Sequence, residues 1–234
     1  MASATRHRPG LVTPGARRPA FIAHGGGNTP ELARGALQAR ADYLEVDLWL
    51  HNRQFEARHE RRFPFHFPVF YEKWYMRRAP RRPFRLPDVL SCSCPGAGVF
   101  LDLKNGGVEA ARLVAEAVAG APPACPVAAS SQVWGLLRPL AAAAPEVSLF
   151  YSIDVQAKLD LFLSVSLRDH APHGVSCRHT LLTRAVIGAL HERGLDVVAW
   201  TVDDETRAAE LIAMGVDAIT THRVAELRAS LGLE

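Results

Sequence analysis

Two histidines, three carboxylates and one lysine fall at the ends of short apolar runs, and together these groups could cleave a phosphate diester. The runs read FIAH, YLEVD, FEARH and VFLDLK, and each has the pattern of a β-strand with polar residues at or near its C-terminal end. Carboxylates hold hard divalent cations, imidazoles transfer protons near neutral pH, and an ammonium group neutralises a phosphoryl oxygen. The set therefore matches the needs of a metal-assisted attack on phosphorus: His24, Glu45, Asp47, His59, Asp102 and Lys104.

The three carboxylates form a candidate site for a divalent cation. Glu45 and Asp47 are two residues apart on one predicted strand, so both side chains point to the same face. Carboxylates that share a face repel each other unless a cation or a proton lies between them. Asp102 ends a strand expected beside theirs, and an all-carboxylate set suits Mg²⁺ or Ca²⁺ better than zinc. The alternative is that Glu45 and Asp47 form salt bridges inside a barrel.

Strand and helix patterns alternate over residues 20–234, which predicts an α/β fold, a single-domain TIM (β/α)8 barrel. The length of 234 residues and the hydrophobic content of 48% suit one domain with a large core. Active sites of such barrels lie at the C-terminal ends of the strands, where the polar residues fall. The predicted strands cover residues 21–24, 43–50, 99–103, 126–130, 147–152, 174–177, 196–202 and 217–221. The predicted helices include 30–40, 108–119, 134–143, 183–193, 205–214 and 224–231.

Residues 60–90 form an insert after the second strand and interrupt this alternation. The stretch Arg61–Arg85 holds eight basic residues against a single acid, Glu72, and interleaves them with aromatic residues. Connections of this length are usually functional or disordered, and the aromatic content favours order. Because the insert follows His59 directly, we expect a substrate-binding lid on the active-site rim. The alternative is a surface excursion that packs elsewhere.

The N-terminal segment and the cysteines indicate the location and the redox state of the protein. Residues 1–19 are polar, basic and rich in Pro and Gly, which predicts a flexible arm. They contain no apolar stretch of signal-peptide length, and no run in the chain reaches the length of a membrane span. A cytoplasmic protein is therefore predicted. The cysteine spacing does not match a zinc site, so reduced thiols are expected at Cys92, Cys94, Cys125 and Cys177.

The order and spacing of six motifs resemble the glycerophosphodiester phosphodiesterase family. The motifs are IAHGGGNTPE, ADYLEVDL, ARHE, FLDLK, VVAWTVDDE and MGVDAITTHR, and they extend over roughly Phe21–Val224. The resemblance implies a metal-dependent phosphodiesterase with a divalent cation on Glu45, Asp47 and Asp102. It also implies that a neighbouring hydroxyl of the substrate attacks phosphorus, which gives a cyclic phosphate that water then opens.

The same resemblance assigns roles to four further residues. His24 and His59 would be the general acid and general base, in either order. Lys104 shares a face with Asp102 and would bind the phosphate; the alternative is an ion pair with Asp102 or Glu45. Trp200 would wall the pocket against the alkyl part of the substrate, or it packs inside the barrel. Seven other histidines are predicted to be surface or loop residues: His51, His66, His170, His173, His179, His191 and His222.

Two positions depart from the family pattern. The family usually carries His-Arg-Gly at the first motif, whereas this chain has His24-Gly25-Gly26 and so lacks an arginine that grips phosphate. Asp102 stands where most members carry glutamate. Both features resemble the related phospholipase D toxins, but the toxins' tail motif is absent here, and the Trp-Thr-Val ending favours the phosphodiesterase branch. Arginines of the insert, or backbone N–H groups of the glycine turn, could replace the missing group.

The leading function is hydrolysis of a glycerophosphodiester- or lysophospholipid-type diester, so the expected partner is a small-molecule substrate. One alternative is a phospholipase D-like enzyme that releases a cyclic phosphate. Another is a non-catalytic barrel that binds phosphate or a lipid headgroup. Nucleic-acid binding through the insert is not expected, because a basic stretch is more often a solvated face or a funnel for substrate.

Overall fold

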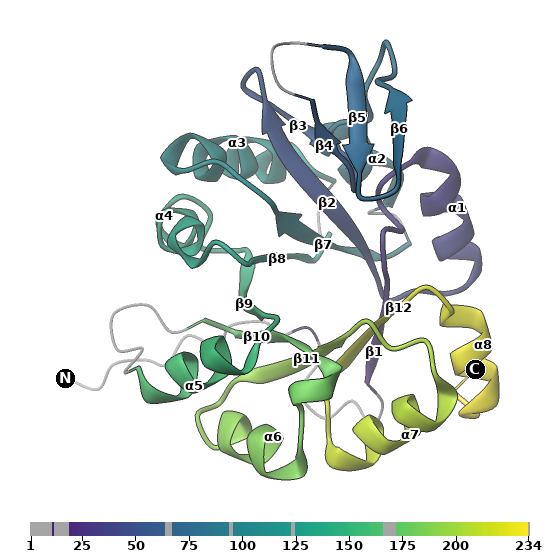
Figure 1. Ribbon diagram of the computed structural model, residues 1–234, viewed down its shortest axis with the longest axis vertical. Coiled ribbons are helices and arrows are strands. Elements are labelled where there is room, and N and C mark those ends of the chain that lie inside the picture. Colours follow the sequence, from purple (N-terminus) through teal and green to yellow (C-terminus); the bar gives the residue numbers. More distant parts are fainter. Residues whose placement is uncertain are drawn as a thin grey trace.

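A closed parallel barrel surrounded by helices is the framework of the chain (Figure 1). The computed structural model describes Leu11 and residues 19–63, 67–93, 96–122, 125–165 and 172–233. Among these residues, eight parallel strands pair in the order β1-β12-β11-β10-β9-β8-β7-β2, and pairing of β1 with β2 closes the ring. The strands are β1 Ala20–Ala23, β2 Tyr43–His51, β7 Gly98–Leu103, β8 Val127–Ser131, β9 Ser148–Ile153, β10 Gly174–Arg178, β11 Asp196–Trp200 and β12 Ala218–Thr221. The TIM barrel predicted from the sequence is confirmed.

The helices form an outer layer around the barrel (Figure 1). They are α1 Pro30–Gln38, α3 Val108–Ala119, α4 Leu137–Ala143, α5 Gln156–Ser164, α6 Arg184–His191, α7 Glu205–Met214 and α8 Val224–Ser230, with short 3-10 turns at Trp134–Leu136 and His179–Leu181. Local signals set their ends. The Thr29 hydroxyl caps α1 by accepting a hydrogen bond from the backbone N–H of Leu32 at 3.2 Å. Gly215 ends α7 with a φ of 99°, a conformation that glycine adopts without strain.

The core lies inside the barrel and between the barrel and its helices. Inside, large side chains such as Phe100 and Phe150 pack with ring centroids 5.4 Å apart, next to Ile22 and Val198. Leu11 is buried in the same cluster, although it belongs to the N-terminal arm predicted to be flexible. Of that arm, only Leu11 and Pro19 lie within the described residues. The packed interior leaves room for polar side chains at the C-terminal ends of the strands.

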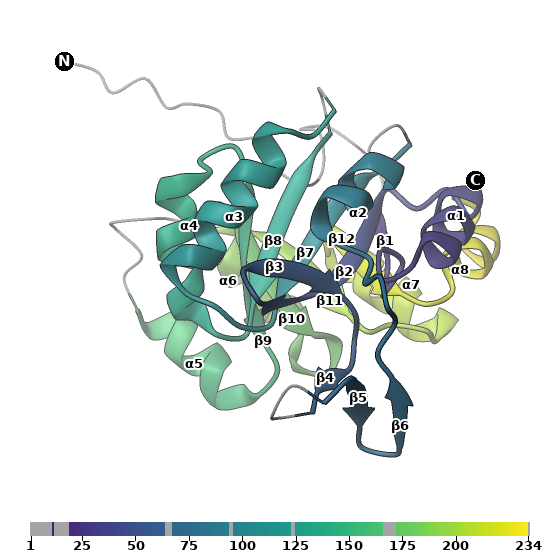
Figure 2. The ribbon, with the colours of Figure 1, turned by 90° about the horizontal axis from the view of Figure 1, so that it is seen from above.

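The insert folds into a small sheet of its own. Strand β3 (Gln54–Ala57) first pairs with β2 in an antiparallel hairpin. The antiparallel sheet that follows consists of β4 Arg61–Arg62, β5 Val69–Glu72 and β6 Tyr75–Arg78, and the helix α2 (Leu86–Ser93) leads back to the barrel. This sheet stands away from the barrel in Figure 2. The sequence patterns predicted neither the sheet nor α2.

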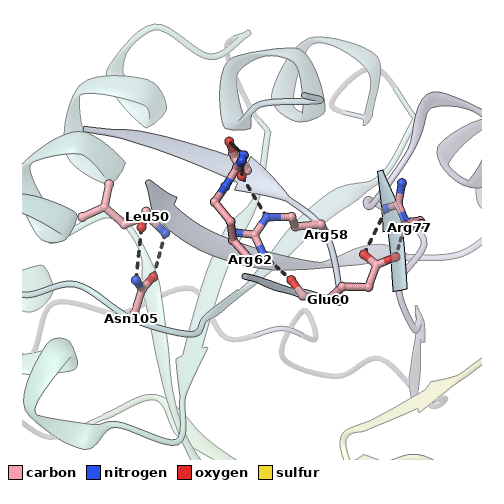
Figure 3. A network of polar contacts seen from close by, with 7 residues as sticks. Leu50, Arg58, Glu60, Arg62, Arg77 and Asn105 are labelled. Atoms are coloured by element: carbon pink, nitrogen blue, oxygen red, sulfur yellow. Dashed lines mark hydrogen bonds and ion pairs between the residues drawn. The ribbon is translucent and has the colours of Figure 1, made fainter. Parts of the chain in front are cut away.

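Ion pairs to two buried glutamates, Glu56 and Glu60, hold the insert in place (Figure 3). The carboxylate of Glu56, on β3, accepts hydrogen bonds from Arg58 Nε at 2.9 Å and Arg62 Nη2 at 2.7 Å. Glu60 accepts a bond from Arg77 Nη2 at 3.0 Å. The guanidinium groups of all three arginines lie within 5.2 Å of the centroid of the Phe70 ring. The inner face of the small sheet is therefore held by charge pairs and stacked cations.

The cysteines differ in state. Cys92 and Cys177 carry free thiols, whereas Cys125 is disulfide-bonded. The reduced thiol expected at Cys125 is wrong, because pairing depends on proximity in the fold, which cysteine spacing alone does not reveal. Cys94 lies outside the described residues.

No helix within the described ranges is both long enough and apolar enough to cross a membrane.

Removal of the Glu56 carboxylate is expected to destabilise the protein strongly. Glu56→Ala leaves the guanidinium of Arg58, which is 4% exposed, without its carboxylate partner. Breaking a buried pair in this way costs about 3 kcal/mol or more of unfolding free energy. The matched control is Glu116→Ala, which breaks the exposed pair with Arg112 and should cost about 0.5 kcal/mol. Urea denaturation monitored by circular dichroism measures both, and equally small losses would contradict the anchoring role.

Candidate active site

Every site residue named from the sequence lines one cavity at the C-terminal ends of the barrel strands. The cavity has a volume of about 230 Å³. The polar side chains come from β2, β7 and the segments that follow β1 and β3, which are far apart in the sequence. Parallel strands place their C-terminal ends at one side of the barrel, so these groups meet. The residues so placed are His24, Glu45, Asp47, His59, Asp102, Lys104 and Trp200.

Three carboxylates crowd together at one side of this cavity. The register of β2 and β7 sets Asp47 directly opposite Asp102. One carboxylate oxygen from each of these residues and from Glu45 lies within 4.8 Å of the other two. Burial of Glu45, followed by repulsion from Asp47 and Asp102, holds the pKa of Glu45 well above its ordinary value. Burial also raises the pKa of Asp102.

Lys104 is the counter-charge of the cluster. Its Nζ lies 2.6 Å from Asp47 Oδ1 and contacts Asp102 Oδ2. Burial lowers the pKa of Lys104, but the carboxylates of Asp102, Asp47 and Glu45 outweigh it, so the pKa is raised overall. One ammonium against three carboxylates leaves two formal negative charges when all are ionised. Asp102 Oδ1 is buried and has no partner among the described residues, so a divalent cation fits both the charge and the open oxygen.

The turn after β1 holds two of these carboxylates in place. Asn28 Nδ2 donates to Asp47 Oδ2 at 2.7 Å, and the backbone N–H of Asp47 donates to Asn28 Oδ1 at 2.9 Å. The backbone N–H of Gly25, at a φ of 63°, donates to Glu45 Oε2 at 2.6 Å. Sequence reasoning missed Asn28. Its position in the same turn as His24 was the available signal.

The glycine turn does not offer free backbone donors. Gly25 N–H is taken by Glu45, Gly26 N–H donates to the carbonyl of Ala23 at 3.1 Å, and Gly27 N–H donates to the carbonyl of Glu45 at 2.8 Å. The expectation that this turn could replace the missing arginine by binding phosphate through its N–H groups is therefore wrong.

His24 lies in a cationic and partly buried setting. Its Nδ1 is 3.1 Å from the hydroxyl of Thr201, and its ring centroid is 4.4 Å from that of His222. Burial, and then the neighbouring His222, lowers the pKa of His24 to about 4. The imidazole of His24 is therefore neutral at pH 7.

His222 is a part of the site that sequence reasoning left out. It was predicted as a surface or loop residue, and its side chain is indeed exposed. It nevertheless packs on His24, and its Nδ1 lies 2.8 Å from Asp203 Oδ2. Its neighbour in the sequence, Thr221, ends β12 beside β1, and His24 directly follows β1, so this strand pairing was the available signal. His66 and His170 lie outside the described residues.

His59 is oriented by the insert. Its Nδ1 lies 3.1 Å from Glu72 Oε2, on strand β5. A carboxylate oxygen at this distance favours the tautomer with its proton on Nδ1, which leaves Nε2 for other partners. Glu72 stands out in the sequence as the lone acid of a basic stretch, but the sequence does not show that this stretch folds back on His59.

A second cavity of about 760 Å³ adjoins the first and shares His59, Asp102 and Lys104 with it. Its remaining wall comes from the barrel and from the insert, chiefly Trp49, Gln132, Val133, Arg61, Tyr71 and Lys73. Within the described part of the chain, neither Arg61 nor Lys73 has an ion-pair partner. The guanidinium of Arg61 lies 6.0 Å from the Trp49 ring centroid. The insert thus brings two uncompensated cations to the edge of the carboxylate cluster.

Comparison with known proteins gives two sequence matches. Residues 125–226 match the model of the Glycerophosphoryl diester phosphodiesterase family. A segment of 47 residues is 49% identical to YhdW, a candidate glycerophosphodiester phosphodiesterase of Bacillus subtilis. That match covers 20% of this chain and 19% of the Bacillus protein, so it extends over about a fifth of each.

Solved structures match over most of the chain. A phosphodiesterase of Oleispira antarctica, solved with the product sn-glycerol-3-phosphate, has a TM-score of 0.74 at 18% identity and covers 92% of this chain and 97% of its own. A glycerophosphodiester phosphodiesterase of Parabacteroides distasonis has a TM-score of 0.74 at 19% identity, with the same coverage. One from Thermotoga maritima has a TM-score of 0.70 at 17% identity and covers 91% and 98%. At these identities the likeness shows the fold. The family model, the Bacillus relative and the solved structures all show that this chain is similar to the glycerophosphodiester phosphodiesterase family.

Proposed function

We propose that the protein is a metal-dependent phosphodiesterase that hydrolyses a glycerophosphodiester- or lysophospholipid-type diester. One observation supports this above the others: three carboxylate oxygens within 4.8 Å of one another share a cavity with two imidazoles and a lysine. A purely structural cluster would need the acids and Lys104 but has no use for His24 and His59. The Oleispira relative was solved with sn-glycerol-3-phosphate, which supports a glycerol phosphate unit in the substrate. The cytoplasmic location stays a prediction.

Glu45, Asp47 and Asp102 would hold the divalent cation in this proposal. Their oxygen-only donor set favours Mg²⁺ or Ca²⁺. When bound, the cation would polarise the phosphoryl group and stabilise the charge that develops on its oxygens. Asn28 and Gly25 keep the Asp47 and Glu45 carboxylates oriented toward it through the hydrogen bonds described above.

The two histidines share the proton transfers. His24 is neutral at pH 7 because its pKa is lowered to about 4, so it can accept the proton of the substrate's attacking hydroxyl. That attack forms the new bond to phosphorus and gives a cyclic phosphate. His59, whose Nδ1 lies 3.1 Å from the Glu72 carboxylate, would protonate the departing alcohol. Water then opens the cyclic phosphate with the two roles exchanged. Lys104 would neutralise a phosphoryl oxygen throughout.

The insert supplies the wall of the substrate site. The second cavity, which shares His59 and Lys104 with the first, has room for the alcohol on the far side of the phosphorus. Arg61 and Lys73 line it without ion-pair partners in the described chain, and they would take the place of the missing arginine. The buried pairs of Glu56 and Glu60 favour a fixed wall over a mobile lid.

The reaction itself is the first test. Phosphorus NMR on a panel of glycerophosphodiesters and lysophospholipids, with Mg²⁺, Ca²⁺ or EDTA, should show metal-dependent release of a phosphomonoester.

His24→Ala and His59→Ala should each lower kcat about a hundredfold or more, and the double variant should lose less than the product of the two single losses. Near wild-type turnover in either single variant would contradict the proposed roles of the two histidines. Accumulation of a cyclic phosphate would instead favour the phospholipase D-like alternative.

Asp47→Asn is expected to remove most of the affinity for a divalent cation. The change deletes one anionic oxygen from the cluster but keeps the shape of the side chain, so circular dichroism should report an intact fold. The matched control is Asp160→Asn, an exposed acid on α5 whose carboxylate accepts a hydrogen bond from Gln156. Calorimetry with Mg²⁺ and Ca²⁺ measures both variants, and unchanged binding in Asp47→Asn would show that the cation site is assigned wrongly.

Glu72→Gln is expected to lower kcat about tenfold with little change in KM. The amide removes the carboxylate that orients the His59 ring, and loss of such supporting carboxylates typically costs at least this much. Glu72→Asp should recover part of the rate, and Glu146→Gln, at an exposed acid elsewhere, should change nothing. Nitrogen NMR of the His59 ring would show the lost preference for a protonated Nδ1. A loss confined to KM would point to a mere wall residue.

A further inference from the structure

The insert exposes an unusual concentration of large apolar side chains. Five of the eleven large apolar residues that are exposed in the described part of the chain lie between residues 63 and 76. These five include every aromatic residue among the eleven. Exposed aromatic residues that gather in one place mark an interaction surface more often than scattered ones do. They are Phe63 at 42%, Phe67 at 57%, Trp74 at 92%, Tyr75 at 47% and Met76 at 71% exposure.

Strand pairing puts Phe63 and Met76 on the Tyr71 face of the small sheet and Tyr75 on the other face. Tyr71 pairs with Met76, and Phe63 donates its N–H to Val69, two residues from Tyr71, so these side chains share one face. The opposite face carries Phe70 and Arg77, which are turned to the buried ion pairs. Phe63 packs edge-on against both Phe67 and Tyr71, with ring centroids 6.2 and 5.9 Å apart.

Trp74 lies in the turn between β5 and β6, at the tip of a sheet that projects from the barrel (Figure 2). We use the term insert face for Phe63, Phe67, Tyr71, Trp74 and Met76.

Positive charge without internal compensation borders the insert face. Arg62 and Arg77 are neutralised by Glu56 and Glu60. The exposed cations Lys73, Arg78, Arg81 and Arg82 have no ion-pair partner within the described residues. The partner of this surface must therefore have both an apolar region that takes up these side chains and negative charge beside it.

We propose that the insert face docks on the surface of an anionic lipid bilayer. Trp and Tyr rings favour the headgroup level of a membrane, and apolar side chains such as those of Phe63 and Phe67 favour the acyl boundary. Each lysine or arginine near anionic headgroups adds about fivefold to the partition coefficient.

Other partners fit the surface less well. A second copy of the chain would bring two strongly basic surfaces together, and like charges repel across a symmetric interface. Single-stranded nucleic acid is bound in a basic groove that follows its backbone, whereas Trp74, at 92% exposure, stands on a projecting turn.

Docking of the insert face would also place the second cavity close to the lipid surface. The second cavity takes Tyr71, Arg61 and Lys73 from the same sheet, so a docked insert brings the mouth of this cavity to the bilayer. This consequence rests on the proposed function, whereas docking itself does not depend on catalysis.

Vesicle binding tests the proposal directly. The full chain is sedimented with vesicles of phosphatidylcholine alone and with vesicles of phosphatidylcholine and phosphatidylglycerol in equal parts. We expect binding to the anionic vesicles that falls as salt is added. The Trp74→Ser, Met76→Ser double variant should lower the partition coefficient about tenfold. Arg81→Gln with Arg82→Gln should lower it about 25-fold, from two lost charges.

Matched controls separate docking from folding and from activity. Val108→Ser removes an apolar side chain that is 75% exposed on α3, and Arg34→Gln removes an exposed charge on α1; neither should alter vesicle binding. Turnover of a water-soluble glycerophosphodiester should be unchanged in the Trp74→Ser, Met76→Ser variant, so loss of docking is distinguishable from loss of the enzyme. The proposal would be overturned by equal binding to neutral and anionic vesicles or by equal losses in the control variants. It would also be overturned by tighter binding to a single-stranded oligonucleotide, or by a dimer that the Trp74→Ser, Met76→Ser variant abolishes.

Discussion

The pairing of β2 with β7 imposes the constraint on which the site depends. Its register sets two carboxylates, Asp47 and Asp102, directly opposite each other on neighbouring strands, with Glu45 on the same face. Like charges so placed destabilise a sheet. Lys104 offsets one of the three carboxylate charges, so repulsion among the carboxylates remains. The arrangement therefore lowers the free energy of unfolding. The hydrogen bonds from Asn28 and Gly25 serve the same cluster by fixing carboxylates that would otherwise turn apart.

The barrel and the polar ends of its strands could be predicted from the sequence for a simple physical reason. Parallel strands buried on both faces form short apolar runs, and the first polar residue after such a run marks the end that faces the cavity. His24, Glu45 and Asp102 were found in this way, and so were their neighbours in the same runs. Helix bounds followed where a capping residue was visible, as with Thr29 before α1 and Gly215 after α7.

Tertiary contacts between distant segments could not be read from the sequence. Glu72 looked like the single acid of a basic stretch, and only the fold of the insert brings it to His59. His222 looked like one more exposed histidine until the pairing of β1 with β12 placed it on His24. The arginines of the insert looked alike, yet Arg62 and Arg77 serve buried glutamates while Arg61 does not. The amino-acid composition gives the number of charged residues, but only the fold shows which arginines are paired with carboxylates and which remain free to bind an anion.

The charge balance of the site links the insert to the chemistry. The proposed divalent cation and Lys104 together balance the three carboxylates, so the negative charge of a phosphodiester calls for a further cation. No arginine follows His24, and the N–H groups of the glycine turn are all engaged. Lys104 is itself occupied by Asp47 and Asp102. Among the described residues that line the two cavities, the cationic side chains left without a carboxylate are Arg61 and Lys73, and both belong to the insert. The ion pairs that anchor the insert therefore determine where those two cations stand, and this couples the stability of the small sheet to the binding of an anionic substrate.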